Sequence, residues 1–374
     1  MLGVTLIATL LPFQFGWPAQ WQMTILLDPV DFVANILLFV PLGFLYRLTR
    51  PKTHGFALGV LVLGALLSIA IEVAQLFESA RNTSIVDVVT NAFGAWMGAL
   101  AFDRIAHWAR LHGRIIGWLS LELPLMCLVY LLVPLLWVNS IAVGGEKLRL
   151  AMTLLIGIFG AHLLGGMQRH YFGPLRMSSP QRTAGFTGLL FLAGAFPVLA
   201  SRPIALLTGA AAVTVYAWWQ GCRAVRQAEK NRRFEIPLLK SGAPFYAAYV
   251  VVLVIAPLFD RTSAWHIGVG FTHAASMQIE ILRLLELVAA FTLVGYMVAE
   301  FRGRVENEYR EAVARLIRWG VSVALVGEVL RGFDAGQGAS VARAAILIAA
   351  TLYGGWLYHL QREHVVRLLA LAPR

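Results

Sequence analysis

The sequence has little charge and almost no cysteine. Only 14% of its 374 residues are Asp, Glu, Lys or Arg, whereas about a quarter of the residues in soluble domains are charged. The two cysteines, Cys127 and Cys222, lie in apolar runs and share no spacing pattern, so they indicate neither a disulfide framework nor a metal site. The histidines are scattered without ligand spacing, and we expect no metal and no cofactor.

Long polar stretches are also lacking. The only substantial one, residues 223–241, is too short to form a soluble domain. Hydrophobic residues make up 59% of the chain, and the mean hydropathy is +0.70. This composition predicts an all-α, polytopic transmembrane helical bundle. Although the net charge is +11, we expect no nucleic acid partner, because basic residues in a membrane protein act as topology signals.

Hydropathy predicts about twelve membrane spans. If the N-terminus is cytoplasmic, each segment on the cytoplasmic side holds at least three basic residues, and each outer loop holds no more than two. This alternation predicts that both termini are cytoplasmic. The spans run near residues 1–14, 32–48, 55–77, 84–104, 115–137, 148–168, 184–200, 203–221, 243–259, 277–300, 311–331 and 339–360.

Polar residues recur at helical spacing within residues 28–98. Residues three or four apart share one face of a helix, and polar faces of apolar helices contact other helices or a wet cavity rather than lipid. The predicted orientation brings this set together in the extracytoplasmic half of the membrane. The candidate site residues are Asp31, Asn35, Glu72, Gln75, Arg81, Asp87 and Asn91. In the same region Gly94 and Gly98 predict close helix packing.

These residues carry a resemblance to a known family. Asn35 begins an N-x5-P-L-G-F stretch, Glu72 begins E-x2-Q, and Arg81 begins R-x2-S-x2-D-x3-N-x2-G. This order resembles the VanZ-like family of bacterial membrane proteins over roughly residues 10–110. We therefore expect a VanZ-like transmembrane domain at 1–112 and a further transmembrane region of unassigned role at 113–374.

The resemblance implies a multi-pass protein of the bacterial cytoplasmic (inner) membrane. It also implies a role in the cell envelope, linked to glycopeptide (teicoplanin) resistance or envelope polysaccharide. The family has no settled reaction, so the resemblance gives a role rather than a mechanism. Neither a protein partner nor a catalytic residue follows from it.

A few residues of the VanZ-like region recur near the C-terminus. Three of them return 256 residues later, and Gly43 returns as Gly295. However, Asp87 and Gln75 are replaced by arginines at that spacing. A second copy near residues 243–360 would therefore be degenerate. The recurring residues are Glu72, Phe77 and Ser84, which return as Glu328, Phe333 and Ser340, and the replacing arginines are Arg343 and Arg331.

Glu72 is the central candidate, because an acidic group within a span costs a few kcal/mol unless it is paired or hydrated. It would bind a head group or move a proton, or else form a structural pair with Arg81 or Asn91. Arg81 is suited to an anion such as phosphate, or to an ion pair within its loop. Asn91, like Asn35, also fits an interhelical hydrogen bond.

Asp87 follows Ser84 near the start of a predicted helix, where the pair also fits helix capping. Farther along the chain, Glu280, Arg283 and Glu286 are spaced by three residues within one predicted span. That spacing predicts that these three charges neutralise one another.

The sequence thus predicts an outward-facing polar pocket that binds a polar lipid or a lipid-linked glycan head group. One alternative is an intramembrane enzyme that acts on such a lipid through Glu72 or Asp87 as general acid or base. No nucleophile stands out beside them, so the pattern favours binding over catalysis. The other alternative is a secondary transporter, which twelve spans and a possible repeat would fit.

Overall fold

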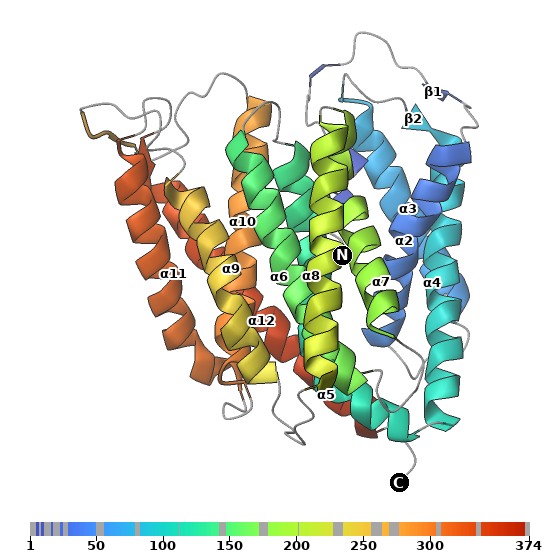
Figure 1. Cartoon of the computed structure of the whole chain (residues 1–374). Coiled ribbons are helices and arrows are strands. Elements are labelled where there is room, and N and C mark those ends of the chain that lie inside the picture. The colour runs from blue at the N-terminus through green and yellow to red at the C-terminus, as the bar shows by residue number, and fades with distance from the viewer. Residues whose placement is uncertain are drawn as a thin grey trace. The chain divides into compact units, whose positions relative to one another are not determined.

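Helices make up nearly all the regular structure in the computed structural model of the chain (Figure 1). The structure describes residues 5–6, 9–10, 16–17, 23–24, 29–49, 56–78, 83–111, 113–141, 147–171, 179–200, 202–226, 235–255, 264–268, 277–303, 308–333 and 338–370. The predicted all-α class is confirmed.

The described elements are mainly helices that follow one another along the chain. The helices are α2 (Pro29–Thr49), α3 (Phe56–Gln75), α4 (Ile85–Leu111), α5 (Gly113–Ile141), α6 (Lys147–Tyr171), α7 (Pro180–Gly194), the 3-10 helix η1 (Phe196–Ala200), α8 (Pro203–Arg226), α9 (Glu235–Ile255), α10 (Met277–Glu300), α11 (Tyr309–Arg331) and α12 (Val341–Ala370). Two-residue strands are β1 (Met23–Thr24), β2 (Thr83–Ser84), β3 (Ile267–Gly268) and β4 (Ala339–Ser340).

Eleven of the twelve predicted spans coincide with helices, because each apolar run lies between polar connections. The first, near residues 1–14, lies largely outside the described residues. By length and composition, six helices in the described part of the chain are able to cross a membrane: α3, α4, α6, α9, α10 and α12. The chain is therefore a helical membrane protein. The count of twelve spans and the cytoplasmic termini stay predictions.

The chain divides into two compact units, and the first comprises Met1–Gly117 with Arg367–Arg374. Within it, α4 packs against both α2 and α3, and β1 pairs in parallel with β2. The α2 and α4 backbones touch. A Cβ added to Gly43 would lie 1.8 Å from the carbonyl oxygen of Ala95, and one added to Gly98 would lie 1.9 Å from that of Val40. The predicted close packing at Gly94 and Gly98 is confirmed.

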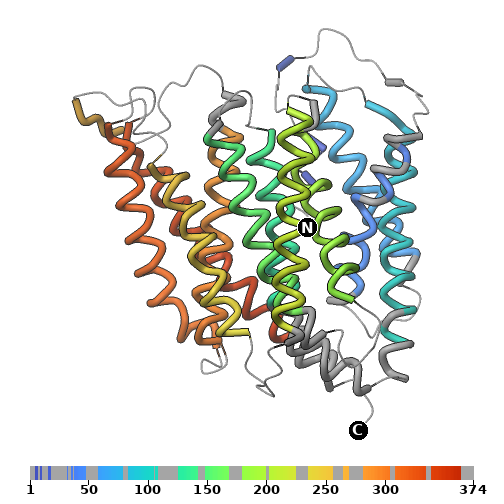
Figure 2. Tube along the Cα trace, in the orientation of Figure 1, coloured from blue at the N-terminus to red at the C-terminus, as the bar shows by residue number. Residues whose placement is uncertain are grey.

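The second unit comprises Trp118–Val366. Its centre is α6, which packs against α7, α8 and α9, while α9 also contacts α10 and α11. Figure 2 traces α9 alongside α11 within this unit. Buried aromatic residues, among them Phe159, Tyr246 and Tyr296, fill the core between the helices. β3 pairs in parallel with β4 at one end of α11 and α12.

The predicted pairing of Glu286 with Arg283 is wrong, while that of Glu280 with Arg283 stays a prediction. Glu286 pairs with Arg149 of α6, whose Nη1 lies 2.7 Å from Glu286 Oε2, rather than with Arg283 on its own helix. Glu286 is 1% exposed, so its charge needs a partner inside the protein. The side chain of Glu280 lies outside the described residues.

Candidate functional site

The end of α3 and the start of α4 are joined through the carboxylate of Glu72. This side chain is 5% exposed, and its Oε2 accepts the backbone N–H of Ser84 at 2.9 Å. Ser84 directly precedes α4, and its Oγ accepts the N–H of Val86 at 3.2 Å, as a helix-capping serine does. In a capping box, the side chain of the residue three positions later, here Asp87, accepts the backbone N–H of the capping residue. In this structure the Ser84 N–H is instead donated to Glu72.

Two amides lie beside Glu72 on the same pair of helices. Asn91 donates from Nδ2 to Ser68 Oγ at 2.9 Å, so its predicted interhelical hydrogen bond is confirmed. Gln75 donates from Nε2 to the carbonyl oxygen of Thr9 at 2.7 Å. The carbonyl oxygens of both amides are buried and have no hydrogen-bond partner within the described part of the chain. The site therefore presents two unused acceptors in addition to a buried carboxylate.

Asp87 adds a second carboxylate to this site. It lies in the first turn of α4, is half-buried, and acts electrostatically on Glu72. Glu72, Gln75, Asp87 and Asn91 thus come together where α3 ends and α4 begins. Asn35 is half-buried on α2.

Two predicted site residues cannot be placed in the same way. The side chain of Asp31 and the whole of Arg81 lie outside the described residues. The geometry of the site consequently rests on α3, α4 and the residues that contact them.

The same arrangement occurs between α10, α11 and α12 in the second unit. Glu328, in the last turn of α11, accepts the backbone N–H of Ser340 at 2.8 Å, just before α12 begins. A Cβ on Gly295 would lie 1.9 Å from the carbonyl oxygen of Thr351, much as one on Gly43 meets α4. We call α2–α4 with β1 and β2 the N-terminal motif, and α10–α12 with β3 and β4 the C-terminal motif.

An aromatic pair repeats as well. Phe44 and Phe102 meet edge to face in the N-terminal motif, with ring centroids 5.5 Å apart. Tyr296 and Tyr358 do the same in the C-terminal motif, also at 5.5 Å. The two motifs therefore agree in strand pairing, in the carboxylate contact, in the glycine crossing and in an aromatic contact.

The motifs differ in how the buried carboxylate is satisfied. Arg343 takes the position that Asp87 has in the N-terminal motif, and its Nε lies 2.7 Å from Glu328 Oε1. Its Nη2 lies 2.8 Å from Oε2 and also donates to the carbonyl oxygen of Gly338. Glu328 thus accepts three hydrogen bonds, whereas Glu72 accepts one among the described residues. Within the part of the chain that the structure describes, internal groups therefore satisfy the C-terminal carboxylate more fully than the N-terminal one.

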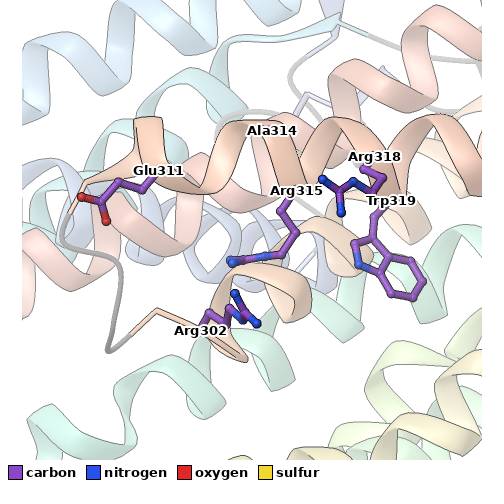
Figure 3. Close-up of a pocket in the computed structure, with 6 residues that line it drawn as sticks. All are labelled: Arg302, Glu311, Ala314, Arg315, Arg318 and Trp319. Carbon is purple, nitrogen blue, oxygen red and sulfur yellow. The ribbon is translucent and has the colours of Figure 1, made fainter.

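The described part of the second unit contains at least two hollows. One, of about 370 Å³, is lined mainly by apolar residues of α6 and α8. The other, of about 500 Å³, is lined by Arg302, Glu311, Ala314, Arg315, Arg318 and Trp319 (Figure 3). Sequence reasoning counted these arginines only as topology charges and missed the hollow. The signal was present in the spacing of three and four residues that places Arg318 and Trp319 on the same face of α11 as Arg315.

Comparison with known proteins supports the predicted family for part of the chain. Residues 3–107 match the family model described as VanZ/LLP1. This segment is therefore VanZ-like, and it contains all the described residues of the candidate site. The comparisons with curated proteins and with solved structures found no match.

Proposed function

We propose, from the VanZ-like assignment of residues 3–107, that this segment binds the head group of a polar membrane lipid or a lipid-linked glycan. The binding site is the polar cluster at the end of α3 and the start of α4. The positive-inside pattern of the sequence predicts that this end faces the extracytoplasmic side of a bacterial cytoplasmic membrane. A role in envelope polysaccharide or glycopeptide resistance belongs to the same proposal and comes from the family resemblance alone.

The observation that carries the proposal is the set of unused acceptors. A buried oxygen that lacks a hydrogen bond costs about 1–3 kcal/mol, and among the described residues the side-chain oxygens of Gln75 and Asn91 are two such groups. They lie beside Glu72 and Asp87, so the site offers acceptors and negative charge. A ligand that fits must donate hydrogen bonds, as sugar hydroxyls or an ammonium group do. Polar lipids and lipid-linked glycans carry such groups at head-group depth.

The two motifs suggest which copy binds. We propose that the chain consists of a VanZ-like domain at 1–112 and a region at 113–374 whose C-terminal motif is a diverged second copy. In that copy Arg343 already donates to the carboxylate of Glu328. A ligand would find fewer unused acceptors there, so the N-terminal site is the one that binds.

Native mass spectrometry of the purified full-length protein in mild detergent tests this proposal. We expect wild-type protein to retain a polar lipid or glycolipid, and the variants Glu72→Gln and Arg81→Ala to lose most of it. Glu328→Gln/Arg343→Met is the matched control, because it makes the same glutamate-to-glutamine change at the corresponding position of the C-terminal motif without leaving the charge of Arg343 unpaired. It should retain the lipid. Equal retention in all four proteins would overturn the proposal. A lipid that wild-type protein alters chemically, and that Glu72→Gln binds without altering, would indicate the enzymatic alternative instead.

A further inference from the structure

The arginine-lined hollow along the first half of α11 has three arginines and one glutamate in its lining. Arg302, from the turn after α10, meets Arg315 and Arg318 of α11 around a space of about 500 Å³. Figure 3 shows the guanidinium groups of Arg302 and Arg315 near each other and the carboxylate of Glu311 turned away from them. In the described part of the chain, neither Arg302 nor Arg318 pairs with a carboxylate. Guanidinium groups gathered in this way repel one another unless an anion lies between them.

The fold of the motif does not require the two arginines of α11, Arg315 and Arg318. The N-terminal motif builds the corresponding helix, α3, with Gly59, Val62 and Leu63 at the positions of Arg315, Arg318 and Trp319. Those residues lie in the half of α3 away from Glu72, just as Arg315 and Arg318 lie in the half of α11 away from Glu328. Arg315 and Arg318 thus distinguish α11 of the C-terminal motif from α3 of the N-terminal motif.

The surroundings of the hollow indicate what the anion is. Trp319 lines it and is 51% exposed, and tryptophan is enriched at the membrane–water interfaces of membrane proteins. The hollow belongs to the side that the positive-inside pattern predicts as cytoplasmic, where anionic lipids are concentrated. Guanidinium groups match the oxygens of a phosphate with two parallel hydrogen bonds.

We propose that this hollow binds the phosphate of an anionic phospholipid. Arg302 and Arg318 donate from opposite sides, and the indole of Trp319 packs against the glycerol region. Arg315 is held on the wall of the hollow by its Nη2, which donates to the carbonyl oxygen of Val298 at 3.3 Å. The site is separate from the polar cluster at Glu72 and does not depend on that cluster's binding a lipid.

The test is a native mass spectrometry titration of delipidated full-length protein with phosphatidylglycerol, and in parallel with zwitterionic phosphatidylcholine. The variant Arg302→Gln/Arg318→Gln removes two exposed arginines without touching the core. We expect it to weaken phosphatidylglycerol binding about tenfold or more, because charge-assisted hydrogen bonds to phosphate are lost. Arg104→Gln removes an exposed arginine elsewhere on the predicted cytoplasmic side and should change binding less than about twofold.

A second variant distinguishes the loss of hydrogen bonds to the phosphate from the loss of the positive charge that orients the helices. Arg302→Lys/Arg318→Lys keeps the positive charge that orients the helices but loses the paired hydrogen bonds, so we expect binding to fall about threefold or more. Unchanged phosphatidylglycerol binding in the glutamine variant would overturn the proposal, as would equal binding of the two lipids by wild-type protein. Complete displacement of phosphatidylglycerol by millimolar inorganic phosphate would show that the hollow is a site for free anions rather than for a lipid.

Discussion

The contrast between Glu328 and Glu72 predicts that the same mutation has different effects in the two motifs. Glu328→Gln keeps an acceptor for the Ser340 N–H but leaves Arg343, which is 5% exposed, without its counter-charge. Removing one partner of a buried ion pair costs about 3–5 kcal/mol. In a unit of this size, each kcal/mol of destabilisation lowers the unfolding midpoint by about 2–4 °C, so the midpoint should fall by roughly 6–20 °C. Glu72→Gln breaks no ion pair among the described residues and should shift the midpoint by less than about 3 °C.

Thermal unfolding of the detergent-solubilised protein, followed by tryptophan fluorescence, measures both shifts. A thiol-reactive dye assigns the transition of the second unit, because both cysteines, Cys127 and Cys222, lie in it. The double variant Glu328→Gln/Arg343→Met removes both charges and should regain most of the loss, since an apolar replacement of a buried pair is often neutral. Equal shifts for Glu72→Gln and Glu328→Gln, or no recovery in the double variant, would refute the reasoning.

Three further predictions concern packing, charge and topology. Gly43→Ala should lower the free energy of unfolding by about 3 kcal/mol or more, because its Cβ would overlap a backbone carbonyl of α4. Gly185→Ala, whose Cβ would meet nothing within 4 Å, should instead stabilise its helix by about 1 kcal/mol. Both are measured as unfolding midpoints, and equal shifts would contradict the packing account. Arg149→Gln should destabilise the protein by about 3–5 kcal/mol, and Arg283→Gln by less than about 1 kcal/mol. A larger loss for Arg283→Gln than for Arg149→Gln in thermal unfolding would contradict the observed ion pair. A fluorescent protein fused after Arg374 should fluoresce and an alkaline phosphatase fused there should be inactive, and the opposite result would place the C-terminus outside.

Hydropathy predicted where helices form but not how many of them cross a membrane. Apolar runs between polar connections gave the positions of α2 to α12, because the alternation of composition is local. Whether a helix such as α7, with 15 residues, spans the bilayer depends on its neighbours and its tilt. Local composition carries no such information.

The candidate site was predictable to the extent that it lies on helix faces. Spacing by three and four residues placed Glu72 and Gln75 on one face and Asp87 and Asn91 on another, and α3 packs against α4. The donor to Glu72 was not predictable, because it is a backbone N–H.

Partners that are distant in sequence were missed for a similar reason. Spacing within α10 suggested Arg283 for Glu286, but the partner is Arg149, 137 residues away. In the same way, the replacement of Asp87 by Arg343 looked like evidence against a repeat. In the structure that replacement supplies the partner of Glu328.

We propose above that the polar cluster at Glu72 holds the head group of a lipid or a lipid-linked glycan. An electron cryo-microscopy map of the protein in nanodiscs of native lipid, with a bound antibody fragment as a fiducial, tests it most directly. We expect non-protein density within about 3 Å of the side-chain carbonyl oxygens of Gln75 and Asn91 and beside the Glu72 carboxylate. A map in which protein side chains or single waters satisfy these oxygens, with no head group present, would contradict it.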